Sequence, residues 1–521
     1  MRLIYMAMIF LVSCGGNKQQ EAVQALTPEE ILEADIKTLT TAFKEKRISI
    51  PELTTFYLDR IQEIDANGPE LHAVLTVNPD AMEIAQQLQQ EFEAGNIRGP
   101  LHGIPVLIKD NIDTHDKMPT TAGSRALAES YPLQDSYIVK KLRDAGAVII
   151  GKTNLSEWAN FRGRKSSSGW SGLGGQTKNP YVLTANPCGS SSGSGVAVSA
   201  NLCVVAIGTE TNGSIVCPST ANGIVGIKPT VGLWSRQGII PISFTQDTPG
   251  PMARNLTDAV TFLALLAGED PADPKTSLSK GQVSEDYTQF LKADGLKGKR
   301  IGVDHSVDSI NDQVDSLMKE ALAIMEAQGA TLVDVGNIMA EGTGDASFTI
   351  MLYEYKDGLN KYFASLGPKA PVKSLEELIA FNKKDSIEMS FYGQEFLEMA
   401  LGKGGMDDKE YLEALQKAME GAGKLGIDKV MDELQLDAIV APTGSPAWTT
   451  DHQNGDKYSM GTSSPAAISG YPSITIPMGF VGELPVGISF FGRAWSEPKL
   501  IEAAFNYEQA SKKRKAPKFI P

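Results

Sequence analysis

Short apolar runs separated by glycine, proline, asparagine and aspartate constrain the fold of this chain more than any other feature. They begin near Pro100 and include the segments GIPVLIKDNI, AGAVIIGKTN, LCVVAIG and GIVGIKPT. Runs of this length and β-branched content are typical of strands that are buried on both faces of a sheet. Because a helical pattern such as residues 135–145 intervenes, we expect an α/β fold whose central mixed β-sheet is covered by helices on both faces.

The same pattern of short apolar runs returns near the C-terminus after a long interruption. Residues 256–434 are more charged and predict a helical insertion, whereas DAIVAPTG, YPSITIPMG and LPVGISFFGR predict that the sheet resumes over residues 437–493. A sheet that is interrupted and then completed implies one large domain. We expect this domain to cover residues 27–521, with its core motifs in residues 100–252.

Two capping sequences predict helices at the start of this domain. The sequences TPEE at residues 27–30 and SIPE at residues 49–52 each place a threonine or serine three residues before a glutamate, with a proline between them. This is the pattern of a capping box, in which side chain and backbone satisfy each other's hydrogen bonds. After the second box, Leu53, Tyr57 and Ile61 fall on one helix face.

The first residues predict a leader that is removed. Arg2 precedes an apolar run from Leu3 to Val12, which suits a signal peptide and is too short for a membrane-spanning helix. The run ends in LVSC, which resembles a bacterial lipobox. We therefore expect cleavage after residues 1–13, lipidation of Cys14 and a tether over residues 14–26. An ordinary signal peptide with a chance cysteine is the alternative.

The leader and the charge of the chain predict where it works and what it binds. A lipid anchor would place the protein in the cell envelope, facing the periplasm or the exterior, with membrane contact through the anchor only. The net charge is -15, and the one basic run is the short tail at residues 512–515. Nucleic acid is therefore not expected as a partner.

Cysteine and histidine usage narrows the chemistry further. Once Cys14 is set aside, an odd number of cysteines remains, and no CxxC or Cys/His spacing is present. These features disfavour both a disulfide framework and a zinc site. None of the five histidines lies near the serine-rich segment, so a Ser-His-Asp triad has no support from the sequence.

Two glycine-rich loops flank an apolar stretch within residues 186–219, which read NPCGSSSGSGVAVSANLCVVAIGTETNGSIVCPS. Glycines let a backbone turn tightly and approach a ligand, and successive N–H groups in such loops can bind an anion. A flexible linker is disfavoured because the apolar run 196–207 follows directly. A nucleotide phosphate loop is disfavoured because the Gly-Lys-Ser/Thr and GxGxxG patterns are missing. Composition alone leaves a structural turn and a catalytic loop equally open.

The wider pattern resembles the amidase signature family. CGSSSGSG is followed, 24 residues after Ser190, by Ser214 in GTETNGSIVCP and then by GIVGIKPTVGL, while HGIPVLIKDNID resembles the family's lysine motif. The resemblance extends from about Leu26 to Phe505. The segments KTNLSEWANFRG, SSSGWSGLGGQTKNP and SRQGIIPISFTQDTPGPM resemble the peptide amidase branch.

This resemblance implies a serine hydrolase of carboxamides that releases ammonia and a carboxylate and needs no metal or organic cofactor. Ser214 matches the nucleophile, Lys109 the catalytic lysine, and Ser190 the serine that follows a cis peptide bond and relays the proton between them. The branch resemblance implies C-terminal peptide amides or related small amides as substrates.

Two further groups of residues have implied roles. The backbone N–H groups of the second loop match the oxyanion hole of the family, namely those of Thr211, Asn212, Gly213 and Ser214. Ser191 and Ser192 are candidates for orienting the relay serine. Lys109 can accept a proton only when neutral, which requires its pKa to fall from about 10.4 to near 7–8, and burial beside residues 104–108 is the expected cause.

Several alternatives remain on the sequence alone. A glutamine-hydrolysing amidotransferase subunit would use the same residues, although a lipoprotein leader argues against cytoplasmic chemistry. A non-catalytic solute-binding lipoprotein is a second alternative, against which the intact lysine and serines argue. Lys152 and Lys228 also follow strand-like runs. An apolar group in residues 389–399 suits core packing or a substrate funnel.

Overall fold

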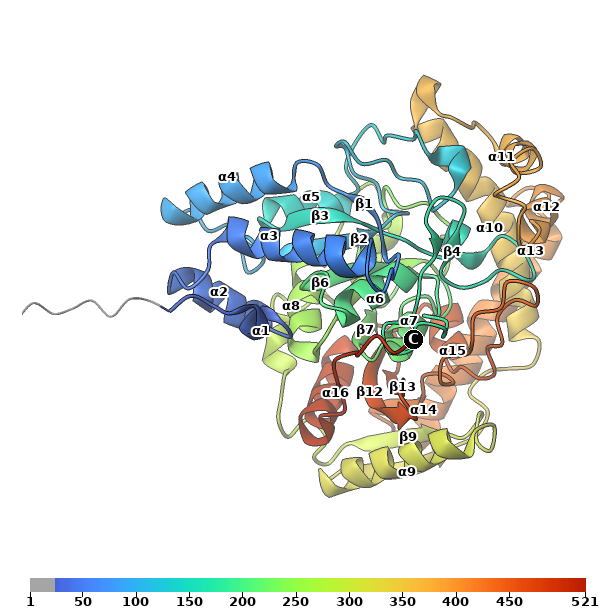
Figure 1. Ribbon diagram of the computed structural model, residues 1–521. Helices are drawn as coiled ribbons and strands as arrows, with labels where there is room; N and C mark the ends of the chain where they lie inside the picture. Colours follow the sequence, from blue (N-terminus) through green and yellow to red (C-terminus); the bar gives the residue numbers. More distant parts are fainter. Residues whose placement is uncertain (1–23) are drawn as a thin grey trace, which may run out of the picture.

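The computed structural model describes residues 24–521, and its centre is a twisted sheet of eleven strands (Figure 1). The strand order is β1-β3-β2-β6-β8-β7-β12-β13-β11-β9-β10. A separate pair of short strands, β4 and β5, forms a second sheet. The strands are β1 (Val74–Val77), β2 (Pro105–Lys109), β3 (Val148–Thr153), β4 (Trp170–Ser171), β5 (Gly175–Gln176), β6 (Val205–Glu210), β7 (Val225–Lys228), β8 (Thr248–Ala253), β9 (Arg300–Asp304), β10 (Thr331–Val335), β11 (Ala438–Pro442), β12 (Ser473–Val481) and β13 (Leu484–Phe491).

The large sheet is mixed, as predicted. β2 lies parallel to β3 and β6, and β9 lies parallel to β10 and β11. The strands between these two groups pair antiparallel, from β6 through β8, β7, β12 and β13 to β11. Every residue of β2, β3 and β6 is buried, which explains why these strands are continuous apolar runs in the sequence.

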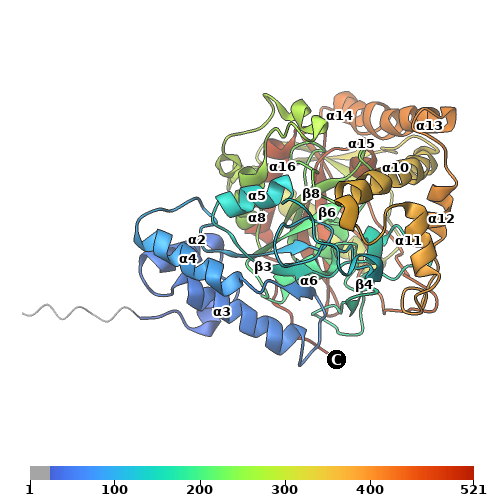
Figure 2. The ribbon, with the colours of Figure 1, turned by 90° about the horizontal axis from the view of Figure 1, so that it is seen from above.

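Helices cover both faces of the sheet, which confirms the predicted fold class. Figure 2 shows α8 and α16 on one side of the central strands and α6 on the other. The helices are α1 (Pro28–Ile31), α2 (Ile36–Lys44), α3 (Ile50–Arg60), α4 (Ala81–Glu93), α5 (Tyr137–Asp144), α6 (Ser192–Ser199), α7 (Val216–Ala221), α8 (Leu256–Leu266), α9 (Asp312–Ala327), α10 (Thr343–Ser365), α11 (Leu375–Asn382), α12 (Glu395–Leu401), α13 (Lys409–Met419), α14 (Asp428–Leu434), α15 (Ser464–Ser469) and α16 (Glu497–Ser511).

Both predicted capping boxes are present. The side chain of Thr27 accepts from the backbone of Glu30 at the start of α1, and Ser49 and Glu52 form the same reciprocal pair at the start of α3. Leu53 and Tyr57 of α3 are fully buried. The cap therefore sets where this helix begins, and the apolar face holds it against the rest of the domain.

The predicted helical insertion over residues 256–434 is wrong in one respect, because β9 and β10 lie within it. These strands complete the edge of the sheet beyond β11. Four of the five residues of β10 are at least partly exposed, so this edge strand lacks the continuous apolar run that identifies the central strands. The remaining elements of the range, from α8 to α14, are helices.

The predicted signal peptide, Cys14 and nearly all of the predicted tether lie outside the described residues. From residue 24 onward, no helix combines the length and the apolar character that crossing a membrane requires.

Candidate active site

Lys109 is the last residue of β2 and is completely buried. Its Nζ lies 2.8 Å from Ser190 Oγ, 3.0 Å from Ser191 Oγ and 2.9 Å from Thr209 Oγ1. The carbonyl oxygen of Thr209 is 3.2 Å away. β2 pairs with β6, and the loop that contains Ser214 follows β6. The end of β2 therefore places the Lys109 amine next to the loops that contain the serines.

Burial lowers the pKa of Lys109 to about 7. The negative charges of Asp247 and Glu210 oppose this shift, and the loss of hydration outweighs them. No carboxylate oxygen lies within 4.0 Å of this amine in residues 24–521. A substantial fraction of the amine is therefore neutral near neutral pH, as a general base requires.

Ser190 follows a cis peptide bond from Gly189. A side chain at Gly189 would place its Cβ only 2.2 Å from Ser156 Oγ, so Ser156, whose hydroxyl accepts from the N–H of Gly169, would have to move. The carbonyl of Ser190 accepts a hydrogen bond of 3.1 Å from the N–H of Ser156. These contacts hold the Ser190 hydroxyl against Lys109.

Of the two serines expected to orient the relay, only Ser191 contacts Lys109. Its hydroxyl donates to the Thr209 carbonyl at 3.0 Å and accepts from the Thr209 N–H at 3.1 Å. The Ser192 hydroxyl instead donates to the carbonyl of Cys188 at 2.6 Å. Thr209 belongs to the second glycine-rich loop of the sequence but had no predicted role, and its hydroxyl also accepts from Asn111 Nδ2 at 3.0 Å.

Ser214 lies in the loop between β6 and α7, and its residue is 8% exposed. The carbonyl of Ser214 accepts from the N–H of Ser191 at 3.1 Å, which joins the two glycine-rich loops. Gly213 has a φ of 84°, a left-handed conformation that favours glycine. Within residues 24–521, the N–H groups of residues 212–214 donate to no other protein atom, so they are free to bind an oxyanion.

Two carboxylates, the buried Glu210 and the half-buried Asp247, support this second loop. Glu210 Oε2 accepts from the N–H groups of Ile215 and Val216 at 2.8 and 3.0 Å. Asp247 accepts from Thr211 Oγ1 at 2.6 Å, and burial raises its pKa to about 6. Glu210 was not predicted from the sequence, because a glutamate at the end of a strand has no distinguishing pattern and acquires its partners only when the loop folds over it.

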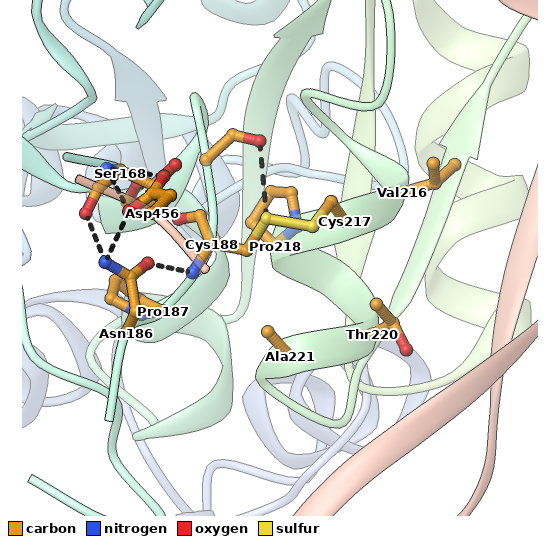
Figure 3. The surroundings of a disulfide bond; sticks show 12 residues. Ser168, Asn186, Pro187, Cys188, Val216, Cys217, Pro218, Thr220, Ala221 and Asp456 are labelled. Atoms are coloured by element: carbon orange, nitrogen blue, oxygen red, sulfur yellow. Dashed lines mark hydrogen bonds between the residues drawn. A yellow bond between two sulfur atoms is a disulfide. The ribbon is translucent and has the colours of Figure 1, made fainter. Parts of the chain in front are cut away.

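A disulfide joins Cys188 to Cys217, with their Cα atoms 5.9 Å apart (Figure 3). The expectation against disulfides is therefore wrong. The odd count arises because Cys203 is a buried free thiol, and a pair 29 residues apart has no local spacing signal. Cys188 lies two residues before Ser190 and Cys217 three after Ser214, so the bond ties the two serine-bearing loops together.

A cavity of about 510 Å³ opens beside these loops. The second loop, residues 211–214, and both disulfide cysteines form one wall. Phe396 and Phe161 line it, whereas Tyr392 is buried against Trp170. The apolar group in residues 389–399 therefore serves both core packing and the cavity wall. The other lining residues include Arg164, Ile242, Met351, Trp448, Asp456, Tyr458, Ser463 and Ser464.

The two other buried lysines occupy different surroundings. Lys152 Nζ donates to the carbonyl of Ile112 at 3.1 Å and to the hydroxyl of Thr120. Lys228 Nζ donates to the carbonyl of Tyr471 at 2.6 Å. Among the described residues, neither amine contacts a serine of the two loops, whereas the Lys109 amine contacts both Ser190 and Ser191. Residues 24–521 contain no group of three or more His, Cys, Asp or Glu side chains able to hold a metal ion.

The family described as Amidase matches residues 52–501, most of the chain. The chain belongs to the amidase signature family. It is an amidase with a single large domain, and its resemblance to peptide amidases is confirmed. The structure of the native peptide amidase from Stenotrophomonas maltophilia is 49% identical, with a TM-score of 0.90, and the match covers 94% of this chain and 99% of that one.

Two further relatives place this amidase within the family. A protein from Arabidopsis thaliana described as a probable amidase is 42% identical, over 99% of this chain and 97% of that protein. A glutamyl-tRNA(Gln) amidotransferase subunit from Carboxydothermus hydrogenoformans is 32% identical, over 94% of this chain and 99% of that protein. The amidotransferase alternative is not favoured, because the chain is less similar to this subunit than to the peptide amidase and the probable amidase.

Proposed function

We propose that this amidase cleaves C-terminal peptide amides, or related small amides, through a Ser-Ser-Lys triad. Ser214 is the nucleophile, Ser190 relays its proton and Lys109 is the base. The observation that supports this most strongly is the 2.8 Å contact between the Lys109 amine and the Ser190 hydroxyl, made by a lysine whose pKa is lowered to about 7.

The reaction begins when the Ser214 hydroxyl attacks the carboxamide carbon. Its proton passes to the Ser190 oxygen as the Ser190 proton passes to neutral Lys109, because a hydroxyl both donates and accepts. The N–H groups of residues 211–214 stabilise the oxyanion, and loss of one such donor typically costs about 3 kcal/mol. The relay then returns a proton to the leaving nitrogen, and ammonia departs.

Water completes the cycle by attacking the acyl group on Ser214. The same relay removes a proton from this water, and collapse of the second tetrahedral intermediate restores the Ser214 hydroxyl and releases a carboxylate. Each half-reaction therefore uses Lys109 first as a base and then, protonated, as an acid.

The size and the walls of the cavity support a peptide amide as substrate. Its volume of about 510 Å³ lies within the range of about 300–1,000 Å³ typical of ligand sites. Apolar groups such as Phe161, Ile242 and Met351 share the walls with hydroxyl and amide groups. The 49% identity to a peptide amidase supports the same substrate class.

Ammonia release from a panel of amides tests this substrate class. The panel comprises dipeptide amides, free glutamine, an aliphatic amide and an anilide, the last followed through its aniline product. We expect kcat/KM to be highest for dipeptide amides. Preferred hydrolysis of glutamine would instead support the amidotransferase chemistry, and no hydrolysis of any amide would support a solute-binding role.

We further propose that the enzyme is a lipoprotein of the cell envelope, anchored through Cys14. A disulfide between Cys188 and Cys217 supports this, because such bonds persist in oxidising compartments. Labelling of cells with a radioactive fatty acid should mark the wild type and not a Cys14→Ala variant. Equal labelling of the two proteins, or of neither, would contradict the anchor.

A further inference from the structure

One wall of the cavity is built by the chain between β11 and α15. Trp448, Asp456 and Tyr458 of this segment all line the cavity. Figure 3 shows Asp456 beside Ser168 and Asn186, close to the disulfide cysteine Cys188. The wall therefore lies next to the loop that contains the relay serine.

Asp456 is held in place by neutral donors only. Its Oδ1 accepts from the N–H of Ser168 at 3.2 Å, from Trp448 Nε1 at 3.2 Å and from Asn186 Nδ2 at 3.4 Å. Its Oδ2 accepts from the Ser168 N–H at 3.0 Å, and the nearby Ser168 hydroxyl also acts to lower the pKa of this carboxyl. A carboxylate offers about four acceptor positions in all, and none of those used here binds a charged donor.

No basic side chain neutralises this carboxylate. Within residues 24–521, no lysine, arginine or histidine nitrogen lies within 4.0 Å of Asp456, and burial raises its pKa. A charge that is partly removed from water and has no charged partner is unfavourable, and such groups normally bind a cation or a further hydrogen-bond donor. In a substrate cavity, the substrate is the available source of that donor.

Trp448, whose indole N–H donates to Asp456, packs against a second aromatic ring that lines the cavity, that of Tyr458. The rings of Trp448 and Tyr458 lie 5.6 Å apart, edge to face. A carboxylate next to aromatic side chains is a favourable setting for an ammonium group, because the charge and the ring faces both attract it. The basic residue on the cavity wall is Arg164, and its guanidinium lies over the ring of Phe396, 5.9 Å from the centroid.

The loop that contains Ser190 lies one contact away from this wall. Ser168, which donates to Asp456, has its Cβ 3.3 Å from the position that a Cβ on Gly189 would occupy. Gly189 precedes the relay serine Ser190. A group bound at Asp456 therefore belongs to the part of the substrate close to the scissile amide.

We propose that Asp456, with Trp448 and Tyr458, binds an ammonium group of the substrate. The preferred substrates are then carboxamides that carry a free amino group near the scissile amide, such as short peptide amides with an unblocked N-terminus. This inference rests on the proposed function. The α-amino group of such a peptide, rather than a lysine side chain, supplies the ammonium, because the site lies close to the reacting centre.

A comparison of three substrates of the wild type tests the proposal. The substrates are glycyl-phenylalanine amide, its N-acetyl derivative and N-acetyl-lysyl-phenylalanine amide. Ammonia release is measured at pH 7, because an α-amino group with a pKa of about 7.7–8.0 is mostly protonated there. We expect acetylation to lower kcat/KM by about 10- to 100-fold, chiefly through KM, as the loss of a hydrogen bond to a charged group predicts. The lysine side chain should not restore it.

Variants then assign the preference to Asp456. Asp456→Asn keeps an acceptor for Ser168 and removes the charge, so it should lower kcat/KM for the free amine and abolish its advantage over the acetylated substrate. Asp456→Glu should retain part of the preference. Asp65→Asn is the control, because Asp65 is likewise a carboxylate that accepts backbone N–H groups, although it is more deeply buried than Asp456. Asp65 does not line the cavity.

Several results would overturn the proposal. Equal kcat/KM for the free and acetylated dipeptide amides would do so without any variant, and so would a preference for acidic substrates, which would point to Arg164. An equal loss for both substrates in Asp456→Asn would show a structural role instead. If no peptide amide is hydrolysed at all, the proposed function fails and the inference fails with it.

Discussion

At the scale of single residues, the environment of Lys109 determines what this site can do. A lysine in water is protonated at neutral pH and cannot act as a base. Here burial at the end of β2 lowers its pKa to about 7, and three hydroxyls surround its amine. Lys228 is equally buried and its pKa falls to about 8, but its amine donates to a backbone carbonyl. Burial lowers the pKa at both positions, and only at Lys109 are serine hydroxyls in reach.

The pH dependence of the reaction should report this lysine. The neutral amine is the active form, so kcat/KM should rise with pH and reach half of its plateau near about pH 7. Lys109→Ala should lower kcat by about 10²- to 10⁴-fold and abolish this rise of kcat/KM with pH. The control Lys228→Met should keep the rise. A rise in kcat/KM with an unchanged midpoint in Lys109→Ala would show that another group is the base.

At the scale of elements, the site depends on the relative position of two loops. The Ser190 loop precedes α6 and the Ser214 loop precedes α7, and they are joined by the hydrogen bond from Ser191 N–H to the Ser214 carbonyl and by the disulfide. Glu210 fixes the start of α7 through two backbone N–H groups. These cross-links fix the positions of Ser214 and Ser190, the proposed nucleophile and relay, relative to each other.

The disulfide should contribute measurably to stability. A cross-link over a 29-residue separation restricts the unfolded chain, so the double variant Cys188→Ser/Cys217→Ser should lose about 2–4 kcal/mol of unfolding free energy. Chemical denaturation with and without a reductant measures this. The reductant should destabilise the wild type and a Cys203→Ala control, and it should not affect the double variant further. A wild type that is insensitive to reductant even when pre-incubated in denaturant would contradict the bond.

At the scale of the whole molecule, sequence and structure agree best where burial is complete. The fully buried strands β2, β3 and β6 were predictable because each is a continuous apolar run. The edge strand β10 was not, because partial exposure removes that signal. Its neighbour β9 is mostly buried but was also missed, because only Ile301 and Val303 in it have apolar side chains. Lys109, Ser190 and Ser214 were predicted from a family resemblance. The composition of the loops alone did not distinguish a catalytic loop from a structural turn.

The walls of the cavity could not be predicted, because they combine segments that are far apart in the sequence. Residues 159–168, the second serine loop, Phe396 and residues 448–464 meet only in the folded molecule. The disulfide was missed for a related reason, since Cys203 makes the cysteine count odd. In each case the missing information is the packing of distant segments, and periodicity in one segment does not contain it.

The central claim is that Ser214 is the nucleophile of a serine amidase, and covalent labelling tests it most directly. The enzyme would be treated with a sulfonyl fluoride, digested and mapped by mass spectrometry, while residual ammonia release is followed in parallel. We predict one modified residue, Ser214, with loss of activity in proportion to labelling, and neither labelling nor activity in Ser214→Ala. Labelling at another residue together with full activity in Ser214→Ala would contradict the account.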